Sequence, residues 1–143
     1  MEEQNYKKHV RLVPPFHFFV LPVLLLTFIG SLINLYQSWG GPGFYSAALI
    51  TTLSLGAMGA AVFARVFALQ AQDRVIRLEE TLRHQALTGK LLDPRLTRGQ
   101  IIALRFAPDA EFTLLAAEAA NKGTPPGEIK KTIRTWRPDY HRL

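Results

Sequence analysis

The chain has 143 residues, a formal net charge of +6 and no cysteine. The lack of cysteine excludes disulfides, thiolate metal sites and cysteine nucleophiles within this sequence. Residues 90–143 contain ten Lys or Arg and only six Asp or Glu. Such a basic segment, if it lies beside a bilayer, is more often attracted to anionic headgroups than to nucleic acid.

Residues 12–64 contain no Asp, Glu, Lys or Arg. Within this stretch, residues 16–35 and 44–63 form two apolar blocks, each about long enough to cross a hydrocarbon core as a helix. The sequence therefore predicts an all-α membrane protein. We expect an N-terminal tail at 1–13, a transmembrane hairpin at 14–69 with helices at 15–36 and 44–69, a stem helix at 70–89, and a C-terminal helical region at 90–143 that folds back on the stem as a small bundle.

The first block is longer than the apolar region of a signal peptide and lacks a small-x-small cleavage site, which favours a retained helix. Pro14 and Pro15 suit a helix start. Pro22 lies further inside, where its missing N–H and its ring should bend or loosen the helix. A simple bend is the favoured interpretation and a functional hinge the alternative. His17 is expected at the cytoplasmic interface.

The two apolar blocks differ in side-chain size. The second has small residues at helical spacing, which allow another helix backbone to approach closely, and the first offers a small notch and an amide. The favoured interpretation is packing within the hairpin, and association with a second copy or another membrane protein is the alternative. The predicted packing residues are Gly30, Asn34, Gly56, Ala57, Ala60, Ala61 and Ala64.

The distribution of basic residues predicts the topology. Lys7, Lys8 and Arg11 precede the first block, Arg65 follows the second, and residues 36–43 between the blocks contain no Lys or Arg. Basic residues concentrate on the cytoplasmic side of membrane proteins. We therefore expect a multi-pass protein of the cell inner membrane with both termini in the cytoplasm and the connection outside.

The stem carries a heptad-like apolar pattern, with a charged face around it. The pattern spans about two and a half heptads, below the length that makes a coiled coil secure. Packing of this stripe on the C-terminal helices is the favoured interpretation, and a dimerising stem is the alternative. The a and d positions are Ala68, Ala71, Val75, Leu78, Leu82 and Gln85.

Three short helices are predicted after the stem ends at Gly89. Thr97 should cap the first, which runs through Phe106, and Pro108 should begin the second, which Gly123 closes. Thr124 and Pro125 should open a third helix that continues through Ile129, Ile133 and Trp136 until Pro138 stops it. Each has one apolar stripe, so none is expected to be stable alone.

The third of these helices would carry a basic face over its apolar stripe. The residues are Lys130, Lys131, Arg134 and Arg137. An ordinary solvated face is the first interpretation, and contact with anionic lipid headgroups is the second. Nucleic-acid binding is a minor alternative, because no base-reading motif accompanies the charge.

The sequence offers no reactive constellation. Its four histidines are not at metal-binding spacing, and it has neither a phosphate-binding loop nor a nucleophile elbow. We therefore expect no enzyme activity, no catalytic residue, no metal and no cofactor.

Four segments, residues 3–7, 72–80, 102–107 and 128–131, together resemble an uncharacterised family of small bacterial proteins with two membrane helices, a domain of unknown function. The resemblance spans almost the whole chain. It implies a bacterial inner-membrane protein with a cytoplasmic helical tail, and it carries no activity or site residue.

The leading functional hypothesis is an accessory or scaffolding subunit that acts by interaction, with membrane lipid and either another copy or another membrane protein as partners. A small transport or channel subunit is the first alternative, in which an oligomer surrounds Asn34 and the Gly56–Ala60 face. A cytoplasmic module that senses anionic lipid is the second.

Overall fold

The computed structural model describes Tyr6 and residues 12–139, and within these it is helical with no strand. This confirms the all-α prediction. The chain divides into two compact units, Arg11–Ala68 and a second that contains Leu69–Leu143. They are called the apolar unit and the C-terminal unit here, and each is described by itself. The predicted N-terminal tail lies largely outside the described residues.

The first helix of the apolar unit begins in a wide π conformation. The π-helix η1 (Pro15–Val20) leads directly into α1 (Leu21–Gln37), and the N–H of Leu21 donates to the carbonyl of Phe16 five residues earlier. Pro22 follows at once and has no N–H to give to Phe18. A π segment beside this proline is the loosening that the sequence predicts.

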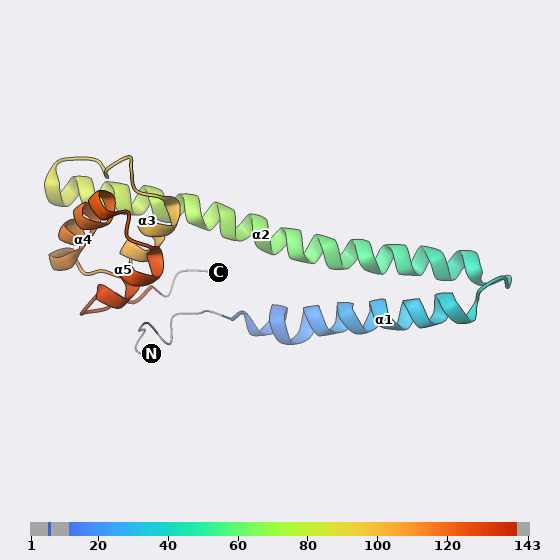
Figure 1. Cartoon of the computed structure of the whole chain (residues 1–143). Helices are drawn as coiled ribbons and strands as arrows, with labels where there is room; N and C mark the ends of the chain where they lie inside the picture. Colours follow the sequence, from blue (N-terminus) through green and yellow to red (C-terminus); the bar gives the residue numbers. More distant parts are fainter. Residues whose placement is uncertain (1–5, 7–11, 140–143) are drawn as a thin grey trace. The chain divides into compact units, whose positions relative to one another are not determined.

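The second helix, α2 (Phe44–Thr88), has 45 residues and starts after a short turn. Gly40 in this turn has a φ of 70°, a left-handed conformation that favours glycine. The ring of Trp39 meets that of Phe44 edge to face, with 5.0 Å between centroids. Because α2 runs unbroken from Phe44 to Thr88, the prediction that the second apolar helix continues into the stem is confirmed (Figure 1).

Small polar side chains make the contact between α1 and the first part of α2. Ser31, Ala47 and Ser54 are buried, and the hydroxyls of Ser31 and Ser54 lie 3.2 Å apart in a hydrogen bond. Thr51 donates its hydroxyl to the carbonyl of Ser31 at 3.1 Å. Small residues at this contact let the two backbones approach closely, and their hydroxyls have partners in or beside it.

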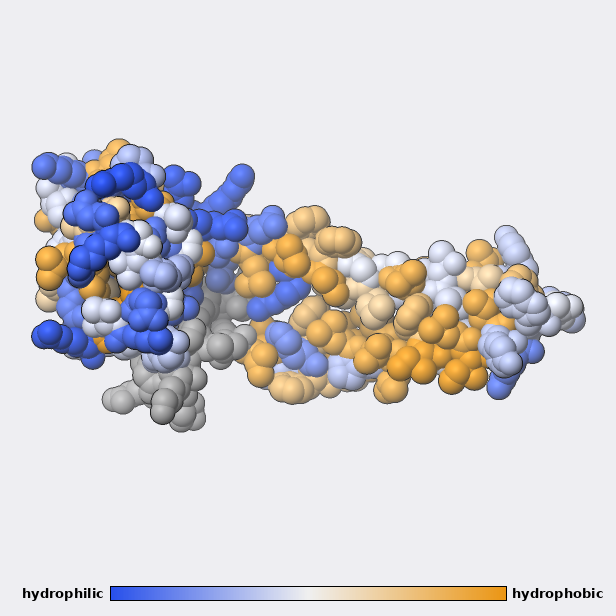
Figure 2. Space-filling model, in the orientation of Figure 1, coloured by the Kyte–Doolittle hydropathy of each residue, from blue (hydrophilic) through white to orange (hydrophobic). Residues whose placement is uncertain are grey.

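The remaining surface of the apolar unit consists largely of exposed apolar side chains, which Figure 2 shows as orange and tan areas interrupted by paler and some blue residues. Phe18, Phe19, Leu26 and Leu53 are each at least two-thirds exposed. The helices Pro15–Gln37 and Phe44–Thr88 are long and apolar enough to cross a membrane, and only 6% and 11% of their apolar windows are buried. A core helix of a soluble protein would instead be mostly buried.

The C-terminal unit has its own hydrophobic core. It contains residues 69–88 of α2 together with α3 (Arg98–Leu104), α4 (Asp109–Lys122) and α5 (Pro126–Thr132). Phe106, Phe112 and Leu104 are its largest fully buried side chains. The core comprises Leu96, Ile101, Ala103, Leu104, Phe106, Ala107, Phe112, Leu115, Ala116, Ala119, Ile129 and Ile133, with Leu92, Ala120 and Trp136 packed against it.

The helix ends predicted at Thr97, Gly89 and Gly123 are confirmed, whereas α3 ends at Leu104, two residues before the predicted Phe106. Thr97 and Gln100 form a capping box at the start of α3, each side chain bonding the other's backbone N–H. Gly123 ends α4 with a φ of 63°, and Gly89 follows α2 with a φ of 73°. Both are left-handed positions that favour glycine at a helix end.

The prediction that the third short helix continues to Trp136 is wrong, because α5 ends at Thr132. The backbone after it bonds elsewhere instead of to the preceding turn. Glu111 accepts the N–H groups of Arg134 and Thr135 at 3.0 and 3.2 Å. The N–H of Arg137 donates to the carbonyl of Phe106 at 2.8 Å. These contacts replace helical hydrogen bonds and hold an extended segment against the core.

The stem uses a different face from the one that the heptad pattern predicts. Ile76 and Glu80 are buried, whereas Val75, Leu78 and Leu82 of the predicted stripe are 53%, 60% and 55% exposed. The stem contacts α3 and α4, and polar and charged side chains supply much of that contact. The apolar stripe is left on the surface of the unit.

Candidate functional site

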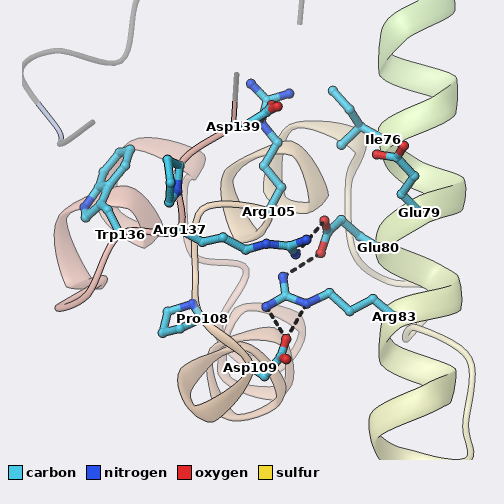
Figure 3. A pocket seen from close by; sticks show the side chains of 11 residues that line it. Ile76, Glu79, Glu80, Arg83, Arg105, Pro108, Asp109, Trp136, Arg137 and Asp139 are labelled. Carbon is cyan, nitrogen blue, oxygen red and sulfur yellow. Dashed lines mark hydrogen bonds and ion pairs between the residues drawn. The ribbon is translucent and has the colours of Figure 1, made fainter. Parts of the chain in front are cut away.

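A cavity of about 830 Å³ opens in the C-terminal unit between the stem and the segments before α4 and after α5. Arginines and carboxylates from several segments point into it (Figure 3). The lining consists of Ile76, Glu79, Glu80, Arg83, Arg105, Pro108, Asp109, Trp136, Arg137, Pro138 and Asp139.

Arg83 on the stem is the centre of the interactions in this cavity. Its guanidinium donates to Glu80 at 2.9 Å and to Asp109, the first residue of α4, at 2.7 Å. A third bond, at 2.8 Å, goes to the carbonyl of Ala107, and the guanidinium lies 4.3 Å from the centroid of the Phe112 ring. The planar guanidinium carries several N–H donors and can therefore bind several acceptors at once. One side chain therefore ties the stem to the start of α4.

The other two arginines come from the far side of the cavity. Arg105 is nearly buried, lies 3.3 Å from the Asp139 carboxylate and covers the Phe106 ring at 4.6 Å. Arg137, in the segment after α5, approaches Glu80 at 4.0 Å. Glu80 thus lies between Arg83 and Arg137, and its burial is compensated by two cations.

The cavity is lined mostly by groups that lie in ion pairs with one another. Its three arginines face four carboxylates, and each arginine lies against one or more of Glu80, Asp109 and Asp139. Within residues 12–139, no cluster of three His, Asp or Glu side chains could hold a metal ion. The arrangement is that of an ion-pair network that joins the stem to the segments around it.

A second, smaller cavity of about 570 Å³ lies under the loop that follows the stem, beside His84 and Leu92. Asp93 holds this loop by two hydrogen bonds from the Arg95 guanidinium and one from its backbone N–H. These bonds lower the pKa of Asp93 to about 2. Arg95 also reaches the side chain of Asn121 at 3.0 Å, which fastens the loop to α4.

The comparisons with known proteins identify one family. Its model is described as a family of unknown function (DUF6526) and matches residues 1–143. The chain belongs to this family. No curated protein and no solved structure matches it. Family membership assigns no activity and no site residue to this DUF6526 member.

The residues that the sequence predicts for helix packing lie mostly on the surface of the apolar unit. Gly30, Asn34, Gly56 and Ala60 are exposed, as are Ala57 and Ala64, and only Ala61 is partly buried. A side-chain Cβ built at Gly30 or Gly56 would meet nothing within 4 Å. The buried residues at the contact between the two helices are instead Ser31 on α1 and Ala47 and Ser54 on α2. Association of the small-residue face with another chain stays a prediction.

The four basic residues predicted to contact headgroups have different surroundings. Lys130 is partly buried with its amine 5.7 Å from the Phe106 centroid, and Arg137 lines the larger cavity. Lys131 bonds Glu128 at 2.8 Å, which raises the pKa of the lysine. Arg134 is exposed but lies beyond the end of α5. They do not form one helical face, so the basis of the lipid-sensing alternative is weakened.

The ion-pair cavity was not predicted from the sequence. The sequence pattern predicts a solvated stem face for Glu80 and Arg83, and a headgroup contact for Arg137. The spacing of three residues between Glu80 and Arg83 is compatible with a helical ion pair. Asp109 and Asp139 are far away in the sequence, and no local pattern links them to the stem.

Proposed function

We propose that this protein is a non-enzymatic integral membrane protein of a bacterial inner membrane, and that its C-terminal unit is an accessory or scaffolding module that acts by interaction. The observation that carries the proposal is the exposed apolar surface of η1, α1 and residues 44–68 of α2. Water does not tolerate so large an apolar surface, whereas the hydrocarbon core of a bilayer covers it at no cost.

In this proposal the two helices cross the bilayer as a hairpin. The turn at residues 38–43 faces outward, with Tyr36, Trp39 and Tyr45 at the outer interface, and both termini are cytoplasmic. These three aromatic side chains are each at least 74% exposed, which suits rings that lie among headgroups. The basic residues near both ends of the hairpin support this orientation.

The C-terminal unit supports an interaction role over a catalytic one. Its core is closed by its own helices, and the three arginines of its larger cavity each lie against a carboxylate. The channel alternative gains no support from the contact between α1 and α2. The hydroxyls of Ser31, Thr51 and Ser54 bond one another or backbone carbonyls there, which favours helix packing over a polar path.

Membrane insertion is tested by extraction. The chain should remain with the membranes after treatment with alkaline carbonate and should be released only by detergent. A reporter that is active only in the cytoplasm should be active when it is fused after Leu143. Release by carbonate, or activity only of a reporter that works outside the cytoplasm, would contradict the proposal.

The accessory role is tested by affinity purification from mild detergent. We expect the chain to elute in a complex of defined stoichiometry, either with itself or with another membrane protein. A control variant should lack the C-terminal unit after Gly89 but keep the hairpin. Elution of the full chain as a monomer without any partner would contradict the interaction role.

A further inference from the structure

The outer face of the stem carries an apolar stripe that is exposed on the C-terminal unit. Val75, Leu78 and Leu82 are each more than half exposed. Ala71 and Gln85 continue the same spacing and are also exposed. At about 100° per residue, this stripe lies on the side of the helix away from the buried Ile76 and Glu80 and from Arg83, which bonds Asp109 of α4. The stem therefore packs on its own chain with one face and leaves the opposite face open.

We propose that this stripe is the interface of a parallel two-stranded coiled coil with the stem of a second copy of the chain. Val75 and Leu82 take position a and Leu78 takes position d. Val75 at position a followed by Leu78 at position d matches the pattern of a β-branched residue at a and leucine at d, which favours two parallel strands. Leu82 at the next a position is not β-branched, so this preference rests on one heptad. The inference rests on the proposed function, because it uses the membrane anchor, and it names the partner of that function.

The charges beside the stripe fit a parallel pair of identical stems. In this register Arg74 is at position g and Glu79 is at position e of the next heptad, five residues later. A parallel arrangement brings Arg74 of each copy to Glu79 of the other, whereas an antiparallel one brings like charges together. Both side chains are exposed, and neither has an ion pair with another described residue. The charge pattern is therefore self-complementary in one orientation.

The membrane anchor compensates for the short length of the stripe. Two and a half heptads would associate weakly in solution. Copies anchored in one bilayer with the same topology share one orientation and a raised effective concentration. The parallel orientation that the charges require is thus the orientation that the anchor imposes.

Single cysteines test the interface directly, since the chain has none of its own. Leu78→Cys places a thiol at position d, and Arg77→Cys places one on a neighbouring exposed face at the same level of the stem. When membranes containing the full chain are treated with an oxidant, Leu78→Cys should form a disulfide-linked dimer, because d positions face each other. Arg77→Cys should stay monomeric. Equal cross-linking of the two, or none at Leu78→Cys, would overturn the inference, as would a cross-link to a different protein.

A charge exchange provides the second test. On the Leu78→Cys background, Arg74→Glu should lower the dimer yield and weaken association roughly tenfold, the scale of two exposed ion pairs lost. Adding Glu79→Arg should restore it, since the pairs re-form with reversed sign. Both sites are exposed, so folding should be kept. No rescue by the double exchange would overturn the parallel register.

The same membranes separate this inference from the proposed function. A chain that resists carbonate but gives no Leu78→Cys dimer would overturn the coiled coil and leave the membrane assignment intact. A chain that carbonate releases would overturn the membrane assignment itself, and with it the anchored dimer.

Discussion

At the scale of single residues, the guanidinium of Arg83 joins three parts of the C-terminal unit. It binds Glu80 on the stem, Asp109 at the start of α4 and the carbonyl of Ala107 between α3 and α4. Its side chain is only 12% exposed and that of Glu80 only 7%. A carboxylate so well buried depends on its cation.

We predict that Arg83→Ala destabilises the C-terminal unit by about 3 kcal/mol or more, because it leaves Glu80 buried with only the distant Arg137 as a partner. The matched control is Arg134→Ala, whose side chain is exposed and which should change stability by less than about 0.5 kcal/mol. Hydrogen exchange of the full chain in detergent measures the opening free energy of this unit. Equal losses in the two variants would contradict a structural role for the Arg83 network.

A second prediction concerns the loop after the stem, where hydrogen bonds from Arg95 lower the pKa of Asp93 to about 2. Since the folded pKa lies below the unfolded value of about 3.9, the contribution of Asp93 to stability is present above pH 4. It is lost as the pH falls through 2. Carboxyl NMR should give a midpoint near 2, and Arg95→Ala should raise it towards the ordinary value. An unchanged midpoint in that variant would contradict the assigned cause.

Residues with local roles could be predicted from the sequence, and residues with distant partners could not. Thr97, Gly89 and Gly123 act on neighbouring backbone, so their helix-end roles are visible in the local pattern. The partners of Arg83 and Arg105 come from segments that only the folded chain brings together. Glu111 accepts the backbone of Arg134 and Thr135, and for this reason the end of α5 was predicted too late.

At the scale of elements, the helices of the apolar unit contact each other through their small hydroxyl residues. Ser31, Ala47 and Ser54 are each less than 7% exposed. The sequence predicts a small-residue contact, but it favours the Gly56, Ala60 and Ala64 face because glycine and alanine are the strongest such signal. Which of two small faces meets α1 depends on the turn at 38–43, and helical spacing alone does not determine it.

We predict that Ser54→Leu destabilises the contact between α1 and α2 by about 1–3 kcal/mol, because a larger side chain overpacks a closed interface. Gly56→Leu, two residues away, should be tolerated, since nothing lies within 4 Å of its Cβ position. The midpoint of thermal unfolding in detergent compares the two. A larger loss in Gly56→Leu than in Ser54→Leu would mean that the helices meet through the other face.

The apolar stripe of the stem was located correctly from the heptad pattern, but its expected partner, the C-terminal helices, was wrong. The heptad stripe exists, but α4 and the segments before it and after α5 lie against the face that carries Glu80 and Arg83. Ion pairs and the buried side chain of Ile76 are enough to hold the stem on that face, because the hydrophobic core of the unit is built mainly by its three short helices. The stripe is thereby left for the second copy that we propose.

At the scale of the whole molecule, the division into two units follows the distribution of charge along the chain. Residues 12–64 lack charged side chains, and the C-terminal unit contains most of the acids and bases. A long apolar segment without charges exposes a surface that water disfavours, and charged side chains are costly in a hydrocarbon core. For this reason the all-α fold class and the two helices long and apolar enough to cross a membrane were predictable from the distribution of residue types, whereas the interior of the C-terminal unit was not.

The most direct test of the account is the position of residues 39 and 134 relative to the membrane. Trp39→Cys and Arg134→Cys each introduce a single thiol into a chain that has none. In intact spheroplasts, a membrane-impermeant maleimide should label Trp39→Cys at once and should label Arg134→Cys only after the membrane is permeabilised. Labelling of Arg134→Cys in intact spheroplasts, or of Trp39→Cys only after permeabilisation, would contradict a hairpin with its turn outside and its C-terminal unit in the cytoplasm.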